Sequence, residues 1–231
     1  MNCIAIIPAR SGSKGLQDKN IATINRQPLI YYSIKAALES RIFKTVMVST
    51  DSNRYAEIAR GCGAEVPFLR SIETSGDKAS TWDVVREVLY NYSDKGLKYD
   101  YVAVLQPTSP LRTAEDIREV IRIKEKYDAN NVVTVTEVEH PVQWCFKLPD
   151  DLRLDDMSQS PYNFMRRQDL EKYYRENGAI YFIDANKILA KDYNFYSDKC
   201  VAMIMPQQRS IDIDSDLDLI VAESIMRNYI S

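Results

Sequence analysis

The stretch NCIAIIPARSGSKG, residues 2–15, joins an apolar run to a polar loop, and this junction decides the fold. Asn2–Ile7 is apolar and stops at Pro8, a pattern that predicts a short buried strand. In the loop that follows, Gly12 and Gly15 let backbone N–H groups approach an anion closely. A ligand-binding loop directly after a buried strand is typical of open α/β sheets.

The same loop carries positive charge. Arg10, Lys14 and Lys19 lie in or just after it, and nucleotide phosphates are the obvious guest for such a set. The spacing is neither that of a P-loop, GxxxxGK[ST], nor that of the dinucleotide fingerprint GxGxxG. An ordinary solvated basic turn is the alternative, and composition alone does not decide between the two.

Beyond this loop, strand and helix patterns alternate along the chain. The expected strands are Lys44–Ser49, Ala64–Phe68, Tyr99–Leu105, Asn131–Val135, Ala179–Ile183 and Cys200–Met205. The expected helices are one opened by Pro28, then Arg54–Cys62 capped by Gly63, Thr81–Tyr92, one around Ile117–Ile121, and Ser215–Tyr229. Such alternation predicts an α/β fold, with a mostly parallel sheet and helices on both faces.

The alternation breaks over residues 139–176, which are polar, aromatic and contain three prolines. We interpret this stretch as an insertion, either a hairpin arm or a flap that binds a partner. The expected domain organisation is therefore a core made of residues 1–138 and 177–231, with residues 139–176 as an inserted arm.

Composition limits the classes of function. The 33 acidic and 30 basic residues give a net charge of −3, whereas nucleic-acid-binding proteins usually carry a basic excess. No stretch approaches the roughly 20 apolar residues that span a bilayer, and the start shows no secretory signal. The four cysteines are far apart without a CxxC pair, which fits a reducing compartment. We expect a cytoplasmic protein that binds neither nucleic acid nor membrane.

A second candidate site is SIDIDSD, residues 210–216. The period-2 pattern of an extended segment puts Asp212 and Asp214 on one side, where two carboxylates could hold Mg²⁺. The alternative is a helix N-terminus in which Asp214, Ser215 and Asp216 act as caps. The two interpretations are compatible, because different residues of the stretch can serve each role.

A third candidate is QPTSPLR, residues 106–112, at the end of a predicted strand. The amide of Gln106 can donate and accept hydrogen bonds at once, which suits a substrate with hydroxyl or amide groups. The alternative is a rigid proline turn that starts the next helix. His140 is the only histidine, and a lone histidine is more often structural than part of a Ser-His-Asp triad.

Together these stretches resemble the acylneuraminate cytidylyltransferases, also called CMP-sialic acid synthetases. The matching blocks are IPARSGSKG (7–15) with DKN (18–20), VSTDS (48–52), AEVPFLR (64–70), LQPTSPLRT (105–113), NGAIY (177–181) and SIDID (210–214). Each block alone is a weak signal, but all of them occur in the family's order over nearly the whole chain.

The resemblance implies a Rossmann-like nucleotidyltransferase fold with a small dimerisation arm, and a homodimer made by exchange of that arm. It also implies the reaction: CTP and an acidic nine-carbon sugar, N-acetylneuraminic acid or a related nonulosonate, give the CMP-sugar and pyrophosphate. The implied cofactor is Mg²⁺, with Mn²⁺ as an alternative.

Site residues follow from the resemblance as well. The nucleotide-binding positions are Arg10, Ser13, Lys14, Lys19, Asn20, Arg70 and Thr81. The sugar-binding positions are Gln106 and, in the arm, Arg167. Asp212 and Asp214 are the metal ligands, and the catalytic residues are Lys14, Lys19 and Asp212.

Three blocks depart from the family pattern. The family's usual DTASS is replaced by DKAST at residues 77–81, and its RPNG is replaced by RENG at residues 175–178. The paired histidines often found in the family are replaced by EHP at residues 139–141. The last two changes lie near the sugar side, so they concern the sugar's identity more than the reaction.

Several alternatives stay open. Legionaminic, pseudaminic or deoxyoctulosonic acid could replace the sialic acid, and GTP could replace CTP. A non-catalytic nucleotide-sugar binding protein is a second alternative. A glycosyltransferase with a DxD motif ranks third, because the Asp212-Ile213-Asp214 motif lies near the C-terminus.

Overall fold

A computed structural model describes residues 1–12, 16–155, 160–190, 194–196 and 199–229. Its centre is a six-stranded sheet in the order β4-β1-β5-β7-β6-β8. The strands are β1 (Cys3–Pro8), β4 (Thr45–Ser49), β5 (Tyr101–Val104), β6 (Asn131–Glu137), β7 (Tyr174–Asp184) and β8 (Cys200–Ile204). A small hairpin, β2 (Thr23–Ile24) with β3 (Gln27–Pro28), stands apart from this sheet.

The sheet is mostly parallel. β1 runs parallel to both β4 and β5, and β6 runs parallel to β8. β7 is antiparallel to both of its neighbours, β5 and β6. Its direction follows from the chain path, because β7 returns from the inserted segment directly alongside β6, as in a long hairpin. The predicted mostly parallel α/β sheet is confirmed.

The helices are α1 (Leu29–Ser40), α2 (Asn53–Gly61), α3 (Ile72–Ser75), α4 (Thr81–Ser93), α5 (Ala114–Lys126), α6 (Ala185–Ile188) and α7 (Asp216–Tyr229). Capping boxes start α4, where Ser80 pairs with Asp83, and α5, where Thr113 pairs with Asp116. Of the helices in the described ranges, none is long and apolar enough to cross a membrane.

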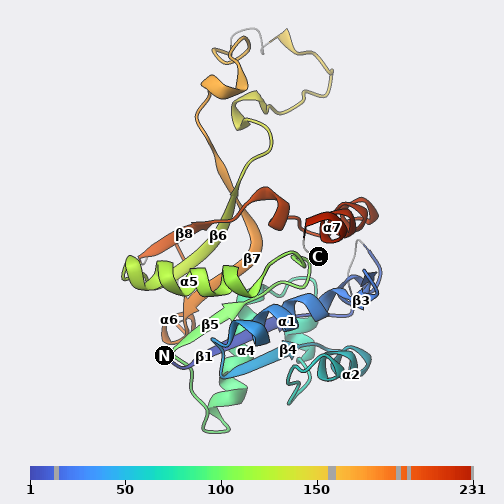
Figure 1. The fold of residues 1–231 in the computed structure, drawn as a ribbon, viewed down its shortest axis with the longest axis vertical. Coiled ribbons are helices and arrows are strands. Elements are labelled where there is room, and N and C mark those ends of the chain that lie inside the picture. Colours follow the sequence, from blue (N-terminus) through green and yellow to red (C-terminus); the bar gives the residue numbers. More distant parts are fainter. Residues whose placement is uncertain (13–15, 156–159, 191–193, 197–198, 230–231) are drawn as a thin grey trace.

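Helices cover both faces of the sheet, as predicted (Figure 1). Ala5 and Ile7 of β1 face a cluster that contains residues of α1, α2 and α5. Ile4 and Ile6 of the same strand face a second cluster, which contains residues of α4 and α6. Because successive side chains of β1 point to opposite faces of the sheet, and both faces are buried, the sheet separates two hydrophobic cores.

One predicted strand is wrong, and one hairpin was not predicted. Ala64–Phe68 is not a strand: its only ladder contact is a single bridge between Glu65 and Met47. Pro67 lacks a backbone N–H and cannot extend that bridge into a ladder. The β2–β3 hairpin was not predicted, because its turn places Asn25 and Arg26 at φ 45° and 66° without the usual glycine.

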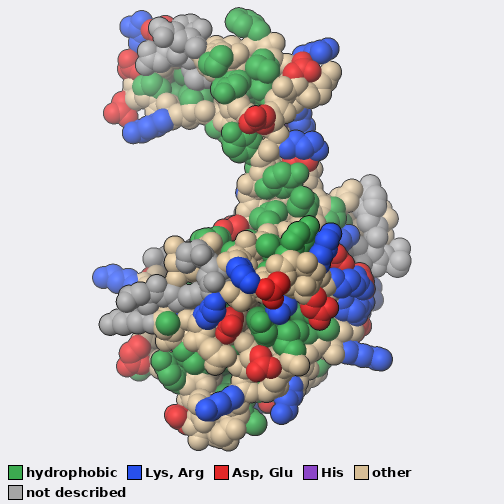
Figure 2. Space-filling view, turned by 90° about the vertical axis from the view of Figure 1, so that its left-hand side faces the viewer, with side chains coloured by type: hydrophobic (Ala, Val, Ile, Leu, Met, Phe, Trp, Pro, Cys, Tyr) green, Lys and Arg blue, Asp and Glu red, His purple; other side chains and the backbone are tan. Residues whose placement is uncertain are grey.

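Residues 138–173 project from the body as an arm, as far as they are described (Figure 1). The β6–β7 ladder extends to the pair Glu137↔Tyr174, so the arm begins where the core sheet ends. Apolar side chains are exposed along it (Figure 2), including Trp144 and Phe164, the latter 98% exposed. Residues 174–176, the end of the predicted insertion, already belong to β7. The division into a core and an inserted arm, and the arm's role in dimerisation, stay predictions.

Candidate active site

A cavity of about 350 Å³ lies at the carboxyl end of the central parallel strands. Open α/β sheets bind their ligands at this edge. Six of the sequence-predicted residues line the cavity together: Arg10, Lys19, Asn20, Arg70, Thr81 and Gln106. Residues as far apart in sequence as Arg10 and Gln106 thus meet in one hollow.

The loop after β1 is held in place by side-chain amide and carboxylate groups. The Asn20 side chain donates to the carbonyl of Arg10 at 2.9 Å. The carboxylate of Asp51 accepts from the Ser11 backbone N–H at 2.8 Å and from its hydroxyl at 3.0 Å. Ser13 and Lys14 lie outside the described residues, so their predicted roles stay predictions.

Thr81 reaches the cavity because α4 begins there. Ser80 caps this helix by accepting from the Asp83 backbone N–H at 3.2 Å. Arg10 pairs with Asp77, just before that cap, at 2.9 Å. The ion pair therefore ties the loop after β1 to the start of α4, whose N-terminus favours a bound anion.

Arg70 is a buried cation in the wall of the cavity. Its guanidinium donates to the hydroxyl and the carbonyl of Ser49, at 3.1 and 2.8 Å. Burial lowers its pKa to about 10, so it keeps its charge at neutral pH. With Arg10 and Lys19 it makes a hollow with three cations and no acidic side chain among the described residues that line it. Such a hollow suits a polyanion.

Gln106 is positioned through its own backbone. Its carbonyl accepts from the Ser33 hydroxyl at 3.1 Å and from Arg112 at 3.3 Å. Arg112 also donates to the Ala179 carbonyl at 2.8 Å, so it joins the turn after β5 to the middle of β7. Gly178, at φ +71°, lies under the Gln106 side chain, where an added Cβ would stand 3.9 Å from the amide. The sequence contained Arg112 in a quoted motif, but nothing in its pattern indicated this role.

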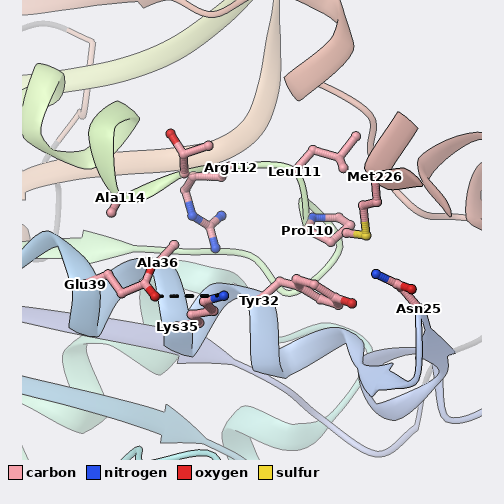
Figure 3. A pocket seen from close by; sticks show the side chains of 11 residues that line it. Asn25, Tyr32, Lys35, Ala36, Glu39, Pro110, Leu111, Arg112, Ala114 and Met226 are labelled. Atoms are coloured by element: carbon pink, nitrogen blue, oxygen red, sulfur yellow. Dashed lines mark ion pairs between the residues drawn. The ribbon is translucent and has the colours of Figure 1, made fainter. Parts of the chain in front are cut away.

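Figure 3 shows a second cavity, of about 250 Å³, beside Arg112. Side chains of α1 line it, including Lys35 and Glu39, which form an ion pair at 3.9 Å. Met226 of α7 closes another side. Pro110, Leu111 and Arg112 of the third candidate stretch line this cavity, but no residue that was assigned a nucleotide, sugar or metal role does. We therefore assign the candidate site to the first cavity.

Residues 210–214 lie against the turn that follows Gln106. The Ile213 backbone N–H donates to the Thr108 carbonyl at 2.8 Å. Arg209, just before this segment, makes a forked pair with buried Asp116 of α5, at 2.8 and 3.0 Å. Two anchors thus fix the segment that carries the predicted metal ligands.

Asp214 pairs with Lys19 of the cavity at 2.8 Å. Asp212 is half-buried, and its Oδ1 is buried without a hydrogen-bond partner among the described residues. Burial raises the pKa of Asp212, and the neighbouring Asp214 raises it further, whereas a hydrogen bond from Thr108 and the charge of Lys19 lower it. The two carboxylates therefore lie next to the cationic cavity.

This donor set fits Mg²⁺. Among the described residues no group of three or more metal-ligating side chains occurs. Mg²⁺ is usually held by one or two carboxylates and completes its shell with water and substrate phosphates. The partnerless oxygen of Asp212, beside a polyanion cavity, is what such a shared ion would require.

The alternative role for residues 214–216 is correct in part. Ser215 caps α7, but its capping partner is Asp218, whose carboxylate accepts from the Ser215 hydroxyl and backbone N–H at 2.7 and 2.8 Å. Asp214 also donates its backbone N–H to Asp218, at 3.0 Å. The carboxylate of Asp218 therefore accepts from the backbone N–H groups just before α7, so the carboxylates of Asp212 and Asp214 are not needed for capping.

Arg167 does not lie in the cavity. It is exposed on the arm, in a hollow lined by Glu137 and Pro206. Within one chain the structure therefore does not bring it to Gln106.

The comparisons with known proteins agree with this geometry. The profile of the cytidylyltransferase family matches residues 4–224. The chain belongs to this family. The N-acylneuraminate cytidylyltransferase of Streptococcus agalactiae serotype V is 38% identical over 222 residues, which are 95% of this chain and 52% of that protein. The chain thus spans about half the length of the N-acylneuraminate cytidylyltransferases that it matches.

Two relatives match along nearly their whole length. The CMP-N,N'-diacetyllegionaminic acid synthase of Legionella pneumophila is 35% identical, with 98% of this chain and 97% of that protein covered. The pseudaminic acid cytidylyltransferase of Campylobacter jejuni serotype O:2 is 33% identical with the same coverage. A CTP complex of CMP-2-keto-3-deoxy-manno-octonic acid synthetase shares the fold, with a TM-score of 0.72, 16% identity, and 98% and 99% of the two chains covered.

In this member of the cytidylyltransferase family a buried asparagine joins the elements of the candidate site. Asn177 is 1% exposed, and its side-chain oxygen accepts from the Thr134 hydroxyl at 2.7 Å and the Ala179 N–H at 3.1 Å. Its amide nitrogen donates to the Ser210 hydroxyl at 2.9 Å. The residue therefore ties β7 to β6 and to the segment that carries Asp212.

We expect Asn177→Ala to lower the free energy of unfolding by roughly 2 kcal/mol or more, because it leaves the Ala179 N–H buried without its partner. Urea unfolding measures this. Asn186→Ala, an exposed asparagine at α6, is the matched control and is expected to change it by less than about 0.5 kcal/mol. Equal, small losses in both variants would contradict the structural role of Asn177.

Proposed function

We propose that this chain transfers the CMP unit of CTP to the anomeric hydroxyl of an acidic nine-carbon sugar. The observation that carries the proposal is the cavity with three cations, placed at the strand ends beside the Asp212–Asp214 segment. The family membership and the named activities of three relatives support it.

The proposed reaction is an in-line displacement. The sugar oxygen forms a bond to the α-phosphorus, the bond to the β-phosphate oxygen breaks, and pyrophosphate leaves with its electron pair. The hydroxyl proton passes to a base or to solvent. Because such transfers depend on positioning and charge stabilisation, the role of Arg10, Lys19 and Arg70 is to hold and neutralise the phosphates. Lys14 is expected to join them.

Asp212 and Asp214 would hold Mg²⁺, or Mn²⁺ in its place. The ion, when bound, supplies positive charge to phosphate oxygens. Lys19 already pairs with Asp214, so this lysine lies between the carboxylates and the phosphate cavity.

We propose that the chain acts as a homodimer and that the arm of a second copy brings Arg167 to the sugar. Gln106 lies in the cavity of the first copy, whereas Arg167 lies apart from it on the arm. Exposed apolar side chains on the arm, such as Phe164 and Trp144, would be covered in such a dimer. Arg167 would then pair with the sugar's carboxylate.

Complementation between two inactive variants tests the exchange. Asp212→Asn and Arg167→Met chains are mixed, unfolded and refolded together. If arms are exchanged, half of the dimers are mixed and each has one intact site, so about a quarter of wild-type activity returns. No return of activity, from a mixture that light scattering shows to be dimeric, would contradict the exchange.

The identity of the sugar is tested with a panel. Pyrophosphate release is measured with CTP and Mg²⁺ for N-acetylneuraminic, legionaminic, pseudaminic and deoxyoctulosonic acids and without sugar, then repeated with GTP. We expect release that depends on CTP and on a nonulosonic acid. A folded protein that binds CTP but is inactive with every sugar would instead favour the non-catalytic binding protein.

We further propose the cytoplasm as the place of the reaction. All four cysteines are free thiols, as a reducing compartment requires.

A further inference from the structure

Glu176 occupies an irregular part of β7 beside the candidate site. The β6–β7 register shifts here: Val133 pairs with Tyr181, whereas Val135 already pairs with Glu176. The residues between them bulge out of the ladder, which brings the side chain of Glu176 back to that of Tyr181.

Each oxygen of the Glu176 carboxylate accepts a phenol hydroxyl. Tyr181 donates to Oε2 at 2.9 Å, and Tyr196 donates to Oε1. Burial, followed by Glu176 itself, raises the pKa of Tyr181, and the same causes raise the pKa of Tyr196 to about 12. Both phenols therefore stay protonated at neutral pH and hold the carboxylate in place as an acceptor.

Glu176 does not line the cavity itself, but its neighbours reach the cavity wall. Gly178, two residues further along β7, lies under the amide of Gln106. Trp82 follows Thr81 of the cavity wall and packs edge-on against Tyr181, with ring centroids 5.6 Å apart. The negative charge of Asp212 also reaches Tyr181. Through Gly178 of the same strand and through its hydrogen-bond partner Tyr181, Glu176 is connected to Gln106 and to the start of α4.

A fixed carboxylate in this place discriminates between the two ends of an acidic sugar. A carboxylate offers about four acceptor positions, and the two phenols use two of them. Glu176 is exposed, so the remaining positions are accessible to a ligand. It repels the acid group of a sugar and attracts N–H or O–H groups.

We propose that Glu176 is a specificity-determining residue, which accepts a hydrogen bond from an N–H or O–H group of the sugar remote from its carboxylate. The proposal rests on the proposed function and deepens it.

Glu176→Gln tests this directly, because it removes the charge and keeps the shape. We expect the KM for the sugar to rise about tenfold, while kcat and the KM for CTP stay within about twofold. Tyr196→Phe keeps the carboxylate but frees one oxygen, and we expect a smaller rise, about threefold. Glu125→Gln, an exposed glutamate near the end of α5, is the charge-matched control and should change neither constant.

Sugar analogues that each lack one N–H or O–H group remote from the carboxylate show which group Glu176 binds. With the analogue that lacks the hydroxyl or acylamino group bound by Glu176, the kcat/KM of the wild type should fall about tenfold relative to the complete sugar. The Glu176→Gln variant already lacks this contact, so its kcat/KM should differ little between the analogue and the complete sugar. An unchanged sugar KM in Glu176→Gln would overturn the inference. Equal changes for sugar and CTP, with a lower unfolding temperature, would also overturn it, because they indicate a structural role. A wild type that is inactive with every sugar would overturn the proposed function itself.

Discussion

Asp212→Asn is expected to lower kcat by on the order of a hundredfold at saturating CTP and sugar. The substitution keeps the shape of the side chain but removes one of two carboxylates beside the cavity, and with it one of the two charged ligands proposed for Mg²⁺. Because the ion would be shared with the phosphates, the loss should appear in turnover and in a higher Mg²⁺ requirement. Pyrophosphate release across a series of Mg²⁺ concentrations measures both.

Asp216→Asn is the matched control. Asp216 is exposed in the first turn of α7, four residues after Asp212, and no role in the site is assigned to it. We expect its turnover to stay within about twofold of wild type. A folded Asp212→Asn protein with wild-type turnover and Mg²⁺ requirement would remove Asp212 from the site.

Lys19→Met is expected to lower kcat/KM for CTP by roughly a hundredfold. Lys19 lines the cavity and lies 2.8 Å from Asp214, so its ammonium would neutralise the phosphates of the proposed substrate as well as the neighbouring carboxylate. Its side chain is only 17% exposed, which weakens screening by solvent. Initial rates over a range of CTP concentrations, supported by calorimetric titration with CTP, give the effect on binding and on turnover separately.

Lys35→Met provides the comparison for Lys19. Lys35 borders the second cavity and its side chain is 50% exposed. The same loss of charge there should leave kcat/KM for CTP within about twofold. If both lysine variants keep wild-type kinetics, the first cavity does not hold the triphosphate.

The sequence was sufficient to predict the mostly parallel sheet and several residues that meet at its carboxyl edge. Apolar runs that end at Pro8 and at Gln106 predicted parallel strands, and parallel strands bring their carboxyl ends to one edge. Loops far apart in sequence therefore had to meet there, and Arg10, Arg70 and Gln106 do. The parallel direction of the strands therefore connects the local sequence pattern to the position of the site.

Other features depend on tertiary contacts that carry no local pattern. Nothing in the periodicity of 179–183 shows that β7 runs antiparallel or that it bulges near Glu176. The clamp made by Arg112 requires two carbonyls from different strands to be adjacent. Arg167 was expected at the sugar from the resemblance, and one chain alone does not place it there.

The most direct test of the account is product analysis by phosphorus NMR of purified protein with CTP, Mg²⁺ and the sugar that the panel selects. We predict that CTP is consumed to give one CMP-sugar phosphodiester and one pyrophosphate in equal amounts, and that nothing forms without sugar. Hydrolysis of CTP without a CMP-sugar, or a folded protein that binds CTP and leaves it intact with every sugar, would contradict the account.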